Sequence, residues 1–64
     1  MRINENLRQQ TKILKALQGI SYAEIAEYME IHVHSFYNWL NNQYNFTTTN
    51  CIRLQQIINT LKEY

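Results

Sequence analysis

The sequence predicts an all-α fold, a compact four- to five-helix bundle that forms a single domain over residues 1–64. Apolar residues recur at spacings of three and four, the period of an amphipathic helix, and no segment shows the alternation of a strand. The chain has no Pro and one Gly, so few residues interrupt its helices. Because so short a chain buries a small share of its surface, we expect marginal stability unless it dimerises.

The first helix is predicted over about residues 4–18. Its inward side is expected to carry four apolar residues, Leu7, Ile13, Leu14 and Leu17. Gly19 follows the last helical turn, where a residue with a left-handed backbone commonly ends a helix.

The second and third helices are predicted over about residues 22–29 and 33–41, with a tight turn between them. Ser21 and Glu24 form the Ser-x-x-Glu capping box, which satisfies the first free amides of a helix reciprocally. The apolar faces of the pair are expected to contain Ile25, Ala26, Met29, Ile31, Phe36, Trp39 and Leu40. Residues 21–40 therefore have the pattern of a helix-turn-helix motif, whose second helix enters the DNA major groove.

The fourth helix follows a polar loop, and Thr47 or Thr48 can cap its start. Its apolar stripe is expected to contain Cys51, Leu54, Ile57, Ile58 and Leu61. As the only cysteine, Cys51 cannot form an internal disulfide and is expected to be a small buried filler. The expected contacts of a homodimer are Ile52, Ile58 and Leu61, of which Ile52 lies off the stripe.

Several functional classes are not expected. No apolar run approaches the ~20 residues that span a bilayer, and the polar N-terminus lacks the core of a signal peptide, so we expect a cytoplasmic protein. Asp is absent, and no nucleophile triad, phosphate loop or acid-base carboxylate pair is present, so we expect no enzyme and no cofactor. His32 and His34 point to different sides of a helix, so no metal site is predicted.

The net charge is only +1, whereas phosphate contacts usually supply much of the affinity for DNA. The charges are nevertheless sorted by helix. One face of the first helix carries the basic residues Arg8, Lys12 and Lys15, and one face of the second carries the acidic residues Glu24, Glu27 and Glu30. Each stripe is also consistent with an ordinary solvated face.

Residues from about 20 to 61 resemble the lambda-repressor-like (Cro/C1-type) helix-turn-helix family of phage, plasmid and bacterial regulators. The resemblance rests on Ile25-Ala26, Ile31, Phe36 and Trp39, and on the loop and the Leu/Ile-striped helix that follow. It implies a transcriptional regulator, a repressor, that binds double-stranded DNA as a homodimer with recognition helices about 34 Å apart.

The chain departs from this family at three places. Glu30 stands where the family usually has Gly, and this requires a strained turn because positive φ is costly for other residues. Tyr22 stands where the family often has a phosphate-binding Gln. The third helix carries no Arg or Lys.

The resemblance places Val33, His34, Tyr37 and Asn38 in the groove. Asn38 can pair with adenine, Val33 can contact a thymine methyl group, and His34 can donate to guanine or phosphate. The full set of candidate DNA contacts is Lys12, Lys15, Tyr22, His32, Val33, His34, Ser35, Tyr37, Asn38, Asn41, Asn42 and Gln43, with Arg8 as a further source of positive charge and Tyr44 as a further backbone donor.

The same features leave an alternative, a small helix-turn-helix protein that binds another protein, such as an antirepressor or inhibitor from a mobile element. The low net charge, the acidic stripe and the uncharged third helix favour it. Solvent-facing tyrosines would also suit a protein interface, and the candidates are Tyr22, Tyr28, Tyr37 and Tyr44.

Overall fold

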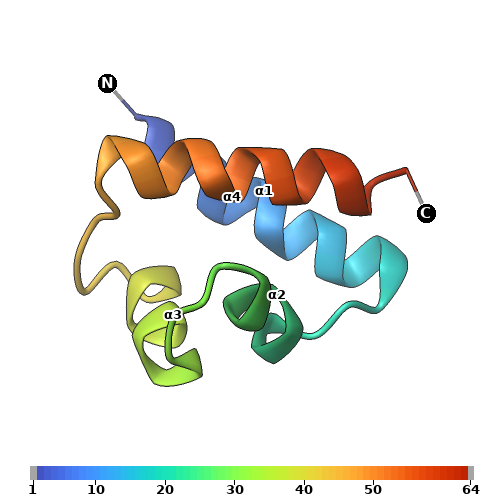
Figure 1. The fold of residues 1–64 in the computed structure, drawn as a ribbon, viewed down its shortest axis with the longest axis horizontal. Helices are drawn as coiled ribbons and strands as arrows, with labels where there is room; N and C mark the ends of the chain where they lie inside the picture. Colours follow the sequence, from blue (N-terminus) through green and yellow to red (C-terminus); the bar gives the residue numbers. More distant parts are fainter. Residues whose placement is uncertain (1, 64) are drawn as a thin grey trace.

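A computed structural model describes residues 2–63, and within them the chain forms four helices and no strand (Figure 1). The helices are α1 (Ile3–Gln18), α2 (Tyr22–Tyr28), α3 (Val33–Leu40) and α4 (Thr48–Leu61). The predicted all-α class is therefore confirmed, with four helices rather than five in this part of the chain. None of these helices is long and apolar enough to cross a membrane.

The first and last helices, α1 and α4, lie side by side and run in the same direction (Figure 1). Halfway along them, the side-chain amide of Gln55 donates to that of Gln10 over 3.0 Å. At their ends, Gln18 donates to the main-chain oxygen of Lys62 over 3.2 Å. This pair forms one layer of the fold, and α2 and α3 form the other.

The predicted capping box opens α2. The Glu24 amide donates to the Ser21 hydroxyl over 3.1 Å, and the Glu24 carboxylate accepts from the Ser21 amide over 3.4 Å. Ala26 is buried where α2 meets α3, and its carbonyl accepts the amide of Ile31 in the turn. These contacts set α3 against α2 as the sequence predicts.

An aromatic cluster occupies the middle of the core, where Trp39 stacks on Phe46 with ring centroids 4.4 Å apart. Cys51 is buried beside them, as expected of a filler. Burial raises the pKa of the Cys51 thiol above its ordinary value, while the charge of Arg8 opposes that rise, so the thiol packs as a neutral group. The buried apolar residues are Leu7, Leu14, Ile25, Ala26, Met29, Phe36, Trp39, Leu40, Phe46, Cys51, Leu54, Ile58 and Leu61.

The inward face of α1 differs from the prediction. Leu17 is 80% exposed and Ile13 is 53% exposed, so both lie outside the core. Their places are taken by Arg8 and Thr11, which are buried. Thr11 can be buried at little cost because its hydroxyl donates to the Leu7 carbonyl over 2.7 Å.

Two of the three expected dimer contacts are also wrong. Ile58 and Leu61 are buried in the core of the single chain, because α4 packs along α1 with its apolar stripe turned inward. Ile57 is only partly buried. Ile52 is 52% exposed and remains a predicted contact.

Backbone turns confirm the predicted end of α1 and the strain expected before α3. Gly19 has φ 69° and its amide donates to the Lys15 carbonyl. Glu30 has φ 60°, the left-handed conformation that favours Gly. Asn42 also has a positive φ, 65°, which Asn tolerates better than most residues.

We expect Glu30→Gly to be more stable than Glu30→Ala by about 1 kcal/mol, because only Gly escapes the steric cost of positive φ. Both variants lose the exposed ion pair between Glu30 and Arg53, 3.6 Å apart, so the comparison cancels that contribution. Urea denaturation of the two variants measures the difference. Equal free energies of unfolding would show that the turn carries no strain.

Candidate nucleic-acid interface

One side of α3 is held by the core and the other faces solvent. Phe36, Trp39 and Leu40 are buried. On the opposite side, His34, Asn38 and Asn41 follow one another at i, i+4 and i+7 and form one polar stripe. His34 and Asn41 are exposed, and Asn38 is half-buried.

Two further candidates lie at the start of α3. His32 occupies the N-cap position, as predicted, but its side chain makes no capping hydrogen bond and is exposed. Val33 is half-buried and packs against the edge of the core. The start of the helix therefore presents an imidazole and a small apolar group side by side.

Tyr22, the first residue of α2, lies between the middle of α3 and α1. Its ring meets Tyr37 edge-on with centroids 5.9 Å apart and lies 6.2 Å from the Phe36 ring. The Lys15 ammonium nitrogen lies 5.2 Å from the centroid of the Tyr22 ring. Tyr22 is thus half-buried rather than solvent-facing, and Lys15 is brought to the flank of α3. Lys12, one turn earlier on α1, is exposed.

Arg8 does not contribute free positive charge, so that expectation is wrong. Its side chain is part of the core, and the residue is only 7% exposed. Its guanidinium donates to the carbonyls of Trp39 and Tyr44, over 2.5 and 2.8 Å, and to the Asn45 side chain over 3.0 Å. It also lies 5.1 Å from the Trp39 ring centroid. Arg8 thereby ties the end of α3 and the following loop to α1.

Asn4 makes a second tie, which the sequence analysis missed. Its side-chain oxygen accepts from the Trp39 indole over 2.8 Å and from the Phe46 amide over 2.9 Å. Its side-chain nitrogen donates to the Phe46 carbonyl over 3.3 Å. Asn4, Arg8 and Thr11 stand at i, i+4 and i+7 and therefore share one face of α1. This spacing is the sequence signal that could have predicted an inward-facing polar stripe.

The residues of the polar loop after α3 differ in role, since some pack on α3 and others are exposed to solvent. The Tyr44 hydroxyl donates to the Ser35 carbonyl over 3.0 Å, so this side chain folds back on α3. Asn41, Asn42 and Gln43 are exposed beside the end of the polar stripe. Their amide groups are neutral donors and acceptors, and they could contact the same ligand as the polar stripe of α3.

Lys15 and Tyr22 thus lie at one flank of α3, and the exposed loop residues follow its end. A family model described as a homeodomain-like domain matches residues 4–45. The match includes α1 from Asn4 onward, α2, the turn, α3 and most of the loop, and it ends before α4. No match was found among curated proteins or among solved structures.

Proposed function

The chain belongs to the homeodomain-like family of helix-turn-helix domains, and we propose that it is a sequence-specific regulator that reads the DNA major groove with α3. The observation that carries this proposal is the polar stripe of His34, Asn38 and Asn41, opposite the buried side of the helix. A major groove about 12 Å wide admits such a helix with its outer side chains against the base edges.

Each side chain on this surface has a distinct role in the proposal. The Asn38 amide pairs with the donor and acceptor of adenine, and Val33 packs against a thymine methyl group. His34 donates to guanine or to a phosphate. Lys15 supplies positive charge at the flank, while neutral amides such as Asn41 bind the backbone and set the register without reading sequence.

The narrower proposal is a repressor of the Cro/C1 type from a phage, plasmid or bacterium that binds a two-fold site as a homodimer. It is supported by α4, whose Leu/Ile face follows the motif as the resemblance implies. A repressor acts by occupying its site, which needs only the surface described. Its two recognition helices would lie about 34 Å apart, in successive major grooves.

The test is selection of bound duplexes from a random library at low salt, with the unmodified chain and with Asn38→Ala. We expect a palindromic site, with an adenine whose preference weakens by about 1–3 kcal/mol in the variant. Gln56→Ala, which changes an exposed polar residue of α4, should select the same site. No enrichment by the folded protein would overturn the proposal.

One observation favours the alternative of a protein-binding module. Glu24, Glu27 and Tyr28 line an acidic hollow on α2, a surface that repels phosphate. If the folded protein selects no duplex, this helix is the place to look for a basic protein partner.

A further inference from the structure

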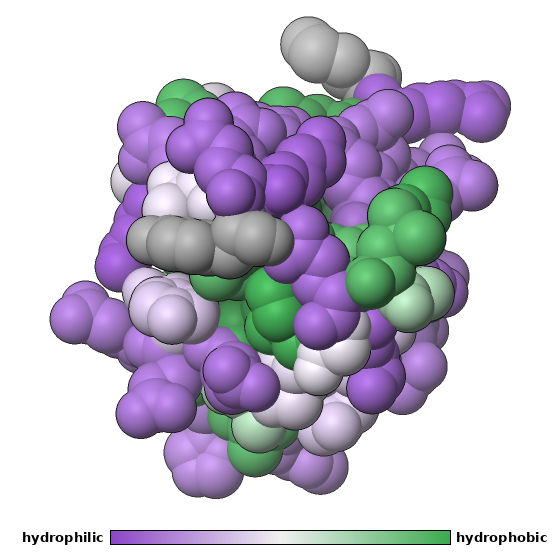
Figure 2. All heavy atoms as spheres, turned by 90° about the vertical axis from the view of Figure 1, so that its right-hand side faces the viewer, coloured by the Kyte–Doolittle hydropathy of each residue, from purple (hydrophilic) through white to green (hydrophobic). Residues whose placement is uncertain are grey.

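The exposed aliphatic side chains are gathered on two neighbouring helices. Among the residues that the structure describes, the exposed leucines and isoleucines are Ile3, Ile13, Leu17 and Ile52, and all of them lie on α1 or α4. The other large apolar groups that reach solvent are tyrosines, which carry a polar hydroxyl. Figure 2 looks onto the end of the molecule where α1 and α4 both end, and it shows hydrophobic atoms standing out from a largely hydrophilic surface.

An amide network joins the outer sides of α1 and α4. The side-chain amides of Gln10 and Gln55 donate to each other, over 3.2 and 3.0 Å. The network extends to Asn6 on α1 and to Asn59 on α4. On each helix these amides stand at spacings of three and four from exposed aliphatic residues, so they share one side with them. We call the combined surface the α1–α4 face, and it consists of Ile3, Asn6, Gln10, Ile13, Leu17, Ile52, Gln55 and Asn59.

The α1–α4 face contains no charged side chain. Lys62 borders it beside Ile13 and Leu17, but this lysine is exposed and its ammonium can extend into solvent. Depletion of charge together with exposed aliphatic groups is typical of the core of a protein–protein interface. A surface of this kind is suited to contact with another protein and not with DNA phosphates.

The chemistry of the α1–α4 face favours a second copy of the chain as its occupant. Side-chain amides both donate and accept, so each can pair with an amide of an identical face, and aliphatic groups are equally self-complementary. The charged sides of the molecule lack this property. Lys12 and Lys15 on α1 would meet their own charge, and so would Glu24 and Glu27 on α2.

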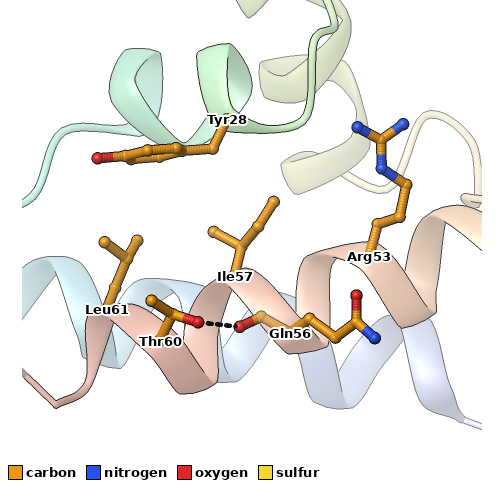
Figure 3. A pocket seen from close by; sticks show the side chains of 6 residues that line it. All are labelled: Tyr28, Arg53, Gln56, Ile57, Thr60 and Leu61. Atoms are coloured by element: carbon orange, nitrogen blue, oxygen red, sulfur yellow. Dashed lines mark hydrogen bonds between the residues drawn. The ribbon is translucent and has the colours of Figure 1, made fainter.

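The groove between α2 and α4 opens on the other side of α4 and is not part of this face. Figure 3 shows the Tyr28 ring on one wall, Ile57 on the other and Arg53 at the margin. Arg53 pairs with Glu30 over 3.6 Å, so this side carries charges. Tyr28 is 56% exposed, close to the 52% of Ile52, and therefore provides a matched apolar position outside the α1–α4 face.

We propose that two copies of the chain pack their α1–α4 faces against each other across a two-fold axis that runs along these helices. The amides then lie at the centre, where polar side chains fix the register, with aliphatic groups toward both ends. The 16 residues of α1 span about 24 Å, so a face two helices wide buries roughly 500 Å² per copy. That area is at the lower limit of specific interfaces, so the dimer is a weak one.

This interface gives the homodimer of the proposed function its contacts, and it rests on that function. Because α3 belongs to the other layer, its outward side stays uncovered (Figure 1). Packed helices lie about 9 Å apart and a helix extends about 5 Å from its axis, so the two copies of α3 lie roughly 30 Å apart at the same end of the dimer. This separation is close to the spacing of about 34 Å between successive major grooves.

Sedimentation equilibrium without DNA, over a series of protein concentrations, tests the interface. The unmodified chain should dimerise, and Leu17→Lys and Ile52→Lys should each raise the dissociation constant about 10-fold or more, because each buries a charge against the other copy. Tyr28→Lys places the same charge at a comparably exposed position outside the face and should leave the dissociation constant unchanged. Circular dichroism checks that all three variants are folded, which their exposure favours.

A mixture of oppositely charged variants tests whether two identical faces meet. Ile52→Glu should also be monomeric by itself, but an equimolar mixture with Ile52→Lys should regain dimers, because the two-fold axis places both substituted positions at the same level. A monomeric unmodified chain, a mixture without dimers, or a dimer that only Tyr28→Lys dissociates would overturn the interface. A monomer that still selects a DNA site overturns only the interface, whereas a dimer that selects no site overturns only the regulator.

Discussion

Arg8→Met should lower the free energy of unfolding by about 2–4 kcal/mol, a large part of what a domain this small possesses. Met keeps the aliphatic packing of the side chain but removes every donor of the guanidinium. The carbonyls of Trp39 and Tyr44 and the side chain of Asn45 then lose charge-assisted hydrogen bonds at a partly dry site. Urea denaturation followed by Trp39 fluorescence measures the loss. Arg8→Lys keeps the charge but not the planar fork of donors, so it should also destabilise the fold.

Variants of Arg8 and Lys15 test which basic groups reach DNA. The salt dependence of DNA binding should be unchanged by Arg8→Met, measured where the variant is folded. In Lys15→Gln, the slope of the logarithm of the binding constant against the logarithm of the salt concentration should become shallower by about one unit per chain, because one phosphate contact is lost. A fall in the Arg8 variant instead would mean that this side chain leaves its buried partners for a phosphate.

Asn4→Leu should cost about 2–4 kcal/mol of stability, because it leaves two buried N–H donors without an acceptor. Those donors are the Trp39 indole and the Phe46 amide, both held by the Asn4 side-chain oxygen. Leu has the same branched arrangement of heavy atoms and leaves no cavity, so the loss comes chiefly from the missing hydrogen bonds.

Thermal and urea unfolding of the Asn4 variant would be compared with Asn6→Leu, an exposed position of the same helix. The control should change stability by no more than about 0.5 kcal/mol. Faster hydrogen exchange of the Trp39 indole proton should accompany the loss. If the two variants are equally stable, Asn4 is not the tie between α1 and the end of α3.

Local sequence signals located the helices. Ser21 and Glu24 start α2, Thr47 caps α4 by accepting from the Asn50 amide, and Gly19 ends α1. Each of these signals works through hydrogen bonds or backbone sterics within a few residues, so it can be recognised without knowing the rest of the fold. The spacing of Ile25, Phe36 and Trp39 likewise predicted how α2 and α3 pack.

The faces of α1 and α4 could not be assigned in the same way. Leu17 is apolar yet exposed, and Arg8 is charged yet buried, because burial depends on which helix lies alongside. Ile58 was expected at a dimer surface, but it is fully buried in the core of the single chain. The contacts of Asn4 and Arg8 join residues more than 30 positions apart in the chain, and helical periodicity carries no information about such pairs.

By itself, the sequence determined where the helices begin and end, the strained turn at Glu30, and the helix-turn-helix pattern with its uncharged third helix. Only the tertiary structure decided that Arg8 anchors α3 while Lys15 stays at its flank, and that Leu17 stands outside the core. The physical reason is the range of the interactions. Caps and turns are made between neighbours in sequence, whereas a side chain's burial and partners are set by packing among distant segments.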